Sequence, residues 1–363
     1  MTLRALAVAG GVLVVLNGLV LWRAESRRAG SAGSAFVDGT LLDASHLARA
    51  HRIVIREKPL TKVVHKEEGF EVTRVVEDDA PIRETTLTRT SAGTWVVSSY
   101  FDLDADMEWV GRTMSDLSQG RLTRFLTSDP ALMSDMGFEG TLVRLEDERG
   151  EVVRQIEMGR KDGGDAYQLV RLAGRDTFVA KHEAEILGDP LAWIVTRVLR
   201  FQAADVRELE LPFLDPKEPP LLLIRGERGA PLEPALERLP NAPRVSPRAE
   251  EVLTKLLAEP LLLAVPRTHP AAQAAAGRIA ARLRLTLFDG RRYEVGYGIA
   301  APGSPALSPD VRNEDAIIMS TTCSQPDDVT QRYGAKVALV YTRGGTLQRL
   351  PVSRAALTAG GAR

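Results

Sequence analysis

Residues 5–22 read ALAVAGGVLVVLNGLVLW, the only stretch of this 363-residue chain with the composition of a membrane-spanning helix. The stretch carries no charge, and Asn17 is its single strongly polar residue. At roughly 1.5 Å of rise per residue, a helix of this length spans about 27 Å, close to the ~30 Å hydrocarbon core of a bilayer. We therefore predict a transmembrane anchor over residues 1–22 that binds membrane lipid through residues 5–22.

A cleaved signal peptide is the alternative for this stretch. Arg4 supplies a charged start, and Gly33-Ser34-Ala35 supplies a small-residue cleavage site. Two features argue against cleavage. The apolar stretch is longer than the usual 7–15 residues of a signal peptide, and four charged residues lie between Arg23 and Arg28.

The charges that flank the anchor bear on its orientation. Arg4 and the amino terminus precede it, whereas Arg23, Arg27 and Arg28 follow it. Because positive charge is enriched on the cytoplasmic side of membrane proteins, this count by itself favours a cytoplasmic body.

Composition sets limits on the rest of the chain. Its length suits two domains, and a hydrophobic fraction of 44% is typical of globular protein. The 47 basic and 48 acidic residues give a net charge of -1, which argues against a nucleic-acid-binding surface. Cys323 is the single cysteine, so the chain has no intrachain disulfide and no cysteine-based metal cluster.

The segment that follows the anchor, residues 23–45, is rich in Gly, Ala, Ser and Arg, which predicts a flexible tether. From His51 onward the pattern is that of an antiparallel sheet. β-Branched runs at 52–56, 62–65 and 71–76 are broken by Pro59 and Gly69. We expect a first α+β module over residues 46–204.

A helix is expected after Asp104 in this module. An apolar stripe at helical spacing supports it, and Gly120 ends it. The stripe consists of Met107, Val110, Met114 and Leu117. Two hairpins follow, with turns at 147–150 and 174–175.

The same order of elements recurs in residues 205–363, which predicts a second α+β module. Ser246-Pro247 is a strong helix start, and Pro260 stops that helix. A hairpin turning at Asp289-Gly290 matches the turn at 147–150, and residues 339–344 resemble residues 169–174. The second match requires about thirty extra residues, so we expect an insert at about 299–336 that contains Cys323.

The predicted fold is therefore α+β: an N-terminal transmembrane helix followed by two tandem, mostly antiparallel β-rich modules. Nine of the 21 prolines lie between Pro212 and Pro247, so the joint between the modules is expected to be stiff.

The order of elements around Trp95, Met136-Gly137-Phe138, the 147–159 hairpin, residues 167–171 and residues 201–206 resembles a bacterial family of unknown function. Members of that family are membrane-anchored and often encoded beside ABC transporters of the gliding-motility type. The resemblance covers most of residues 50–350. It implies a single-span protein of the bacterial inner membrane with ABC transporter subunits as partners. It also implies a periplasmic or otherwise extracytoplasmic body, contrary to the flanking charges. It supplies no catalytic residue.

Few residues suggest chemistry. Asp102, Asp104 and Asp106 alternate as in a calcium loop, but Met107 and Thr113 stand where that loop needs Gly and Glu, so helix capping is expected.

The histidines, His46, His51, His65, His182 and His269, show no metal-site spacing. Cys323 matches no protease signature, and the glycine pairs at 163–164 and 344–345 lack the Lys and hydroxyl residues of a phosphate loop. Trp95, Trp109 and Trp193 are expected in the core, with a ligand groove as the alternative.

We therefore predict no catalytic, cofactor-binding or metal-binding residue and no cofactor. The expected function is that of a non-enzymatic accessory or scaffold protein of the bacterial envelope, associated with an ABC-type transporter. The alternative is an extracytoplasmic ligand-binding module or an unrecognised hydrolase with a pocket between the two modules.

Overall fold

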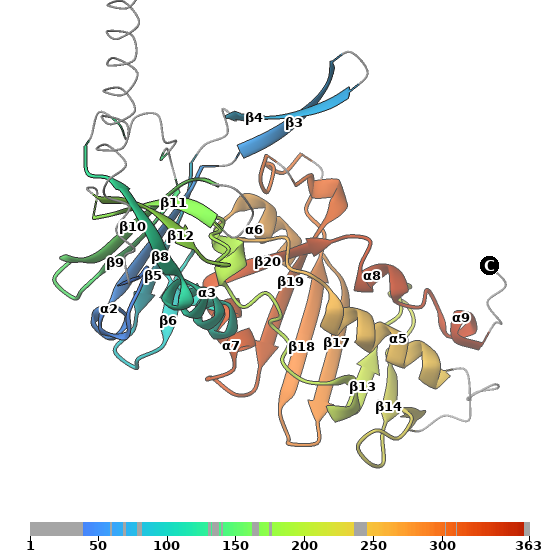
Figure 1. Ribbon diagram of the computed structural model, residues 1–363. Coiled ribbons are helices and arrows are strands. Elements are labelled where there is room, and N and C mark those ends of the chain that lie inside the picture. The colour runs from blue at the N-terminus through green and yellow to red at the C-terminus, as the bar shows by residue number, and fades with distance from the viewer. Residues whose placement is uncertain are drawn as a thin grey trace, which may run out of the picture. The chain divides into compact units, whose positions relative to one another are not determined.

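The computed structural model describes residues 39–58, 60–67, 70–77, 82–129, 132, 138, 141–161, 167–173, 176–235, 245–301, 303–309 and 311–358 (Figure 1). The chain divides into two compact units. The first contains residues up to Tyr100 and Ala105–Trp193, and the second contains Phe101–Asp104 and everything from Ile194 onward. A four-residue piece of chain between two parts of the first unit thus belongs to the second.

The first unit is built on an antiparallel sheet with the strand order β1-β8-β12-β11-β10-β9-β2-β5-β6. A separate hairpin, β3–β4, forms a two-stranded sheet of its own. The strands are β1 (Gly39–Thr40), β2 (Arg52–Glu57), β3 (Leu60–Glu67), β4 (Phe70–Glu77), β5 (Arg83–Arg89), β6 (Trp95–Val97), β8 (Arg121–Thr127), β9 (Thr141–Glu146), β10 (Val152–Lys161), β11 (Tyr167–Leu172) and β12 (Asp176–Lys181). The helices are α2 (Ala44–Arg49), α3 (Met107–Gln119) and a 3-10 turn at Pro190–Trp193.

The second unit is built on an eight-stranded antiparallel sheet with the order β15-β14-β13-β17-β18-β19-β20-β16. Its strands are β13 (Val206–Leu211), β14 (Leu221–Ile224), β15 (Glu233–Pro234), β16 (Leu263–Pro266), β17 (Ile279–Leu287), β18 (Arg292–Gly298), β19 (Ala316–Cys323) and β20 (Val337–Thr342). Its helices are α5 (Val245–Ala258), α6 (Pro270–Ala276), α7 (Val329–Lys336), α8 (Thr346–Arg349) and α9 (Arg354–Thr358), and the short strand β7 (Leu103–Asp104) lies in its four-residue piece.

The two sheets have the same strand order. The first contains β8-β12-β11-β10-β9 followed by β2, β5 and β6, and the second contains β16-β20-β19-β18-β17 followed by β13, β14 and β15. Each strand of the first series therefore has a counterpart at the same place in the second series. Neighbouring strands in both series pair antiparallel. Each unit also places one long helix, α3 or α5, between the three-strand part and the five-strand part of its sequence.

The individual elements around the predicted hairpins are confirmed. The turns at 147–150 and 289–290 join β9 to β10 and β17 to β18. Gly150 and Gly290 adopt positive φ angles of 80° and 88°, a conformation that glycine reaches without steric strain.

The helix predicted after Asp104 is α3, with two differences in detail. Its N-cap is Asp106, whose carboxylate accepts hydrogen bonds from the backbone nitrogens of Glu108 and Trp109 at 3.0 and 3.3 Å. Met107, expected in the apolar stripe, is half exposed, and Thr113 is buried on that face. The buried face of α3 thus consists of Val110, Thr113, Met114 and Leu117.

The stretch at 299–336 is not a simple insert. It contains β19, which pairs with β18 on one side and β20 on the other, so it forms the interior of the sheet. The counterpart of β11 is therefore β19, whereas the sequence match paired residues 169–174 with residues 339–344, which belong to β20. The sequence match was wrong because both β19 and β20 carry the β-branched, apolar pattern of a buried strand.

The predicted fold class is corrected at its N-terminal end. Among the residues that the structure describes, no helix is long and apolar enough to cross a membrane. The transmembrane helix expected over residues 5–22 lies outside those residues, so the structure gives it no support.

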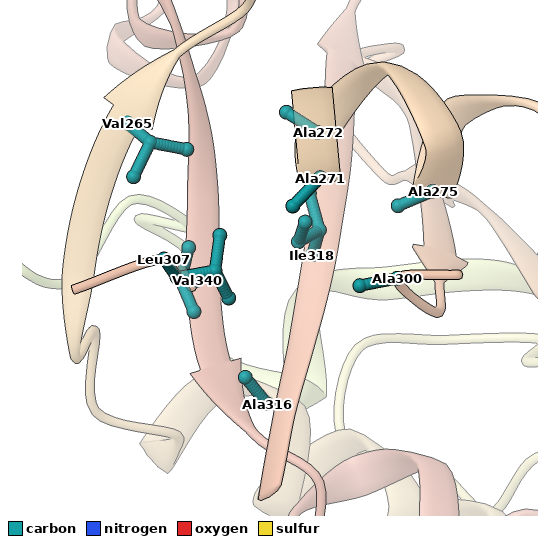
Figure 2. Packing of buried hydrophobic residues seen from close by; sticks show 9 residues of the cluster. All are labelled: Val265, Ala271, Ala272, Ala275, Ala300, Leu307, Ala316, Ile318 and Val340. Carbon is teal, nitrogen blue, oxygen red and sulfur yellow. The ribbon is translucent and has the colours of Figure 1, made fainter. Parts of the chain in front are cut away.

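One core cluster of the second unit lies between α6 and the strands β16, β19 and β20 (Figure 2). Its helix side consists of Ala271, Ala272 and Ala275, and its sheet side includes Ile318 and Val340. Because alanine side chains are short, α6 lies close to the sheet: a Cβ atom on Gly298 of β18 would overlap the backbone of Ala275. This close approach shapes the cavity described next.

Candidate functional site

A cavity of about 320 Å³ lies in the second unit, among α6, α7 and the strands β18 and β19. Such a volume is at the lower end of the range for small-molecule sites in proteins. Its walls are mostly small or apolar, and they include Ala272, Ala276, Ala335 and Met319. The cavity exists because alanines and glycines stand where larger side chains would fill the space.

The cavity opens where two strands of the sheet separate. β19 pairs with β18 as far as Cys323, but its pairing with β20 ends at Met319. Ser320, Thr321 and Thr322 lie beyond that point and line the cavity. On this side of β19, α7 takes the place of a neighbouring strand, and the side-chain oxygen of Gln331 accepts a hydrogen bond from the Cys323 amide at 3.1 Å.

Helix α7 is fixed to the rest of the second unit by a set of buried contacts. The Tyr333 hydroxyl donates to the Asp104 carbonyl at 2.9 Å and accepts from the Val195 amide at 3.2 Å. The Thr330 hydroxyl donates to the Val198 carbonyl at 2.9 Å. Gly334 lies so close to β19 that an added Cβ would overlap the carbonyl oxygen of Thr321. The wall that α7 contributes is therefore held in place from several sides.

Few polar groups line the cavity, and most of them are neutral. Ser320 and Thr322 contribute hydroxyls, and Gln273 and Gln331 contribute amides. Arg267, just after β16, is the one charged residue among the described residues that line the cavity. Its Nη1 atom donates to the Gly334 carbonyl at 2.8 Å, which directs the guanidinium toward the end of α7.

The residues singled out in the sequence have structural roles away from this cavity. Asp106 caps α3, and the Asp104 carboxylate accepts from Arg332 with an Nε–Oδ2 distance of 3.1 Å. Among the described residues, no group of three or more His, Cys, Asp or Glu side chains is placed to hold a metal ion.

Two histidines act at helix ends. His46 and Asp43 form a capping box at the start of α2, and the Nδ1 atom of His269 accepts from the Ala271 amide at 3.2 Å. Burial lowers the pKa of His46, so the imidazole ring stays neutral down to a lower pH than usual. His182 pairs with Gln168, with an Nε2–Oε1 distance of 3.0 Å. The side chain of His65 lies outside the described residues.

The tryptophans and the cysteine also lie outside the cavity lining. Trp193 is fully buried, donates to the Leu187 carbonyl at 2.7 Å and packs edge-to-face on Trp109 at a centroid distance of 6.3 Å. This arrangement confirms the expected core role of Trp193, and Trp109 is half-buried beside it. Cys323 is half-buried, and its Sγ atom accepts from the Gln325 amide at 3.5 Å.

A second polar cluster lies behind the sheet, around Glu259. Its carboxylate accepts from both the backbone nitrogen and the hydroxyl of Thr346, at 3.2 and 2.6 Å. Burial raises the pKa of Glu259, and the two hydrogen bonds from Thr346 oppose that rise. Burial, and then the nearby Glu259 carboxylate, also raise the pKa values of Tyr297 and Tyr341, so both phenols stay protonated.

A shallow depression of about 540 Å³ lies over β13, β17, β18 and β19 on the outer face of the same sheet. Its charges are paired across strands: Arg284 binds Glu210 at 3.1 Å and Glu294 at 3.0 Å. Because these exposed pairs satisfy one another, the surface offers little unbalanced charge to a ligand.

Sequence reasoning did not identify the cavity, although part of its lining was visible in the sequence. The run PAAQAAA at 270–276 follows a cap and begins with proline, which is a helix start. Its buried face consists of alanines, which the sequence does not mark as an apolar stripe. The sequence also predicts an insert over the stretch that contains α7 and β19.

Comparison with known families gives one match. Residues 95–266 match the family described as Domain of unknown function (DUF4340). The matched region runs from β6 in the first unit to the end of β16 in the second, and therefore ends just before the residues that build the cavity. No curated protein and no solved structure matches the chain. Residues 95–266 are thus similar to a family that is described only as a domain of unknown function.

Proposed function

We propose that this protein is a non-enzymatic binding protein whose second unit holds a small ligand in the cavity between α6 and α7. The observation that carries the proposal is the cavity itself, with its apolar walls and a few convergent polar groups. Sites of this kind are the usual form of small-molecule binding sites. The cavity lies inside the second unit, whereas the sequence had suggested a pocket between the modules.

The lining supports binding rather than catalysis. The hydroxyls of Ser320, Thr321 and Thr322 are the nucleophile candidates at the cavity. Activating a hydroxyl requires a base such as histidine or a carboxylate within hydrogen-bond reach. Among the described residues that line the cavity none is His, Asp, Glu, Lys or Cys, so the lining itself supplies no base.

A test needs a variant that fills the cavity without disturbing the fold. Ala276 on α6 and Ala335 on α7 both line the cavity and are solvent-exposed, so a longer side chain fits without displacing the core. Ala274 lies on the same helix as Ala276 but does not line the cavity, which makes Ala274→Leu a matched control.

The experiment is a ligand-observed NMR screen of small apolar and amphipathic fragments against the full chain. We expect fragments that bind the unsubstituted protein to lose at least about tenfold in affinity in Ala276→Leu or Ala335→Leu, because the added side chain occupies their space. The same fragments should bind Ala274→Leu unchanged. Absence of any binding fragment, or equal affinity in all four proteins, would overturn the proposal.

We also propose that binding serves an accessory role beside an ABC-type transporter of the bacterial envelope. This second part rests on the family resemblance of the sequence and on no feature of the cavity. Crosslinking in cells followed by identification of the captured proteins tests it. Repeated capture of transporter subunits would support the association, and capture that lacks them under mild and crosslinked conditions alike would oppose it.

A further inference from the structure

The charge around the cavity restricts what can bind there. Arg267 contributes a full positive charge, and none of the described lining residues contributes a negative one. The remaining polar groups are neutral hydroxyls and amides. A cationic ligand would therefore meet a like charge with no compensation, whereas an anion would meet an unopposed guanidinium.

The guanidinium of Arg267 has more N–H donors than its hydrogen bond to Gly334 uses. Nη1 is held by the Gly334 carbonyl at 2.8 Å, and a guanidinium carries five N–H groups in a planar fork. A planar carboxylate matches this fork in a way that a spherical anion does not. The bond to Gly334 orients the fork at the edge of the cavity, so a carboxylate can reach it without first ordering the side chain.

The remainder of the cavity is suited to a short apolar group. Ala272, Ala276 and Ile279 form one side, and Ile318, Met319 and Val337 contribute to the others. A volume of about 320 Å³ accommodates a compact ligand and excludes a folded chain segment. Burying an alkyl group against these side chains is favourable because it removes apolar surface from water.

We propose that the cavity binds a small monocarboxylate with a short apolar body, its carboxylate on Arg267 and its hydrocarbon part between α6 and β19. This assignment rests on the proposed binding function and specifies the chemical class of its ligand. Arg267 is then the residue that determines specificity, because the walls accept an apolar group regardless of the charge at its end.

The test compares ligands that share one hydrocarbon chain and differ at the end. Hexanoate, hexanamide and hexylamine are titrated into the full chain by isothermal calorimetry or ligand-observed NMR. Hexanoate should bind about tenfold or more tightly than hexanamide, as expected for a charge-assisted bidentate hydrogen bond, and hexylamine should bind most weakly. Raising the ionic strength should weaken hexanoate binding and leave hexanamide unchanged, because salt screens only the charged pair.

Variants of Arg267 locate the effect. In Arg267→Met, the affinity for hexanoate should fall to the affinity for hexanamide. Arg267→Lys should recover part of the difference between the two affinities, since lysine keeps the charge but lacks the planar fork of N–H donors. Arg278→Met is the matched control, because Arg278 is exposed just after α6, does not line the cavity and changes the net charge equally. It should leave all three affinities unchanged.

The outcomes separate the two proposals. Equal affinity for hexanoate and hexanamide, with both lost in Ala276→Leu, would overturn the carboxylate assignment and leave the binding function standing. A hexanoate preference that persists in Arg267→Met would also overturn it. If Arg267→Met loses binding of hexanamide as well, the two affinities are compared in Arg267→Lys. Equal affinities for hexanoate and hexanamide in that variant would overturn the carboxylate assignment. If no ligand binds the unsubstituted chain, both proposals fail.

Discussion

The β11–β12 connection of the first unit and the β19–β20 connection of the second join equivalent strands in sheets of the same order. In the first unit β12 pairs with β11 along its whole length, from Tyr167 opposite Lys181 to Leu172 opposite Asp176. In the second unit the pairing stops at Met319, and α7 occupies the connection. A short connection keeps two strands together, and a helix in its place lets them separate.

This difference accounts for the site. The cavity lies at the point where β19 continues without β20, and α7 forms one of its walls. The first unit has no such opening between its corresponding described strands, β11 and β12, because they stay paired. In a duplicated topology, one lengthened connection can therefore create a binding site while the sheet stays the same.

The largest effect is expected where α7 approaches the sheet. Gly334→Val places a side chain against the Thr321 carbonyl, so α7 must move away from β19, at a cost of about 3 kcal/mol in unfolding free energy. Hydrogen exchange of the β19 and β20 amides measures the loss.

Gly111→Ala is the matched control on α3 of the first unit. A Cβ at Gly111 meets nothing within 4 Å, so alanine should stabilise α3 by about 0.5–1 kcal/mol through its higher helix propensity. If Gly334→Val leaves exchange unchanged, the close packing of α7 on β19 is not a determinant of stability.

Tyr333→Phe should have the next largest effect. The substitution removes a buried hydroxyl that serves both the Asp104 carbonyl and the Val195 amide, and it leaves these two backbone groups with only their 3.2 Å hydrogen bond to each other. We expect a loss of about 2 kcal/mol, measured by urea unfolding. A loss below about 0.5 kcal/mol would mean that water replaces the hydroxyl and that α7 is held by packing instead.

The helix caps of the two units give a smaller, comparative effect. Asp106 caps α3 and Asp328 caps α7, but Asp328 also accepts from the Tyr293 hydroxyl at 2.7 Å. Asp106→Ala should cost about 1 kcal/mol, the usual value for a lost N-cap. Asp328→Ala should cost about 1 kcal/mol more, because a buried phenol loses its acceptor. Thermal unfolding of the two variants side by side tests the difference, and equal costs would contradict it.

The smallest effect concerns the pH dependence of stability. Because burial raises the pKa of Glu259 above its ordinary value of 4.5, the folded state binds the proton more tightly than the unfolded state. This contribution is fully present below pH 4.5 and is lost as the pH rises through the folded pKa.

Glu259→Gln removes the titrating group, so we expect a flatter stability profile above pH 4.5, with a change below about 1 kcal/mol. Urea unfolding across this pH range measures the slope. An unchanged slope in the variant would show that Glu259 is not its source.

Local sequence patterns predicted much of the secondary structure. The apolar stripe that contains Val110, Met114 and Leu117 is buried on α3, and the Asp-Gly turn at 289–290 joins β17 to β18 as expected. These features depend on residues near one another in the chain, whose backbone preferences and side-chain period are visible in the sequence. The pairing of β19 could not be predicted in this way, because the residue pattern of a strand does not indicate which strands pair with it.

The sequence by itself determined that the chain is β-rich, that its order of elements recurs, and that its charges are balanced. The tertiary structure decided which recurring strands correspond and where two of them separate. The cavity depends on residues brought together from α6, β18, β19 and α7, among them Gly298 and Gly334, whose lack of a side chain matters only where another backbone lies against them. Such close approaches between segments distant in sequence are a property of the packed fold, and no local pattern encodes them.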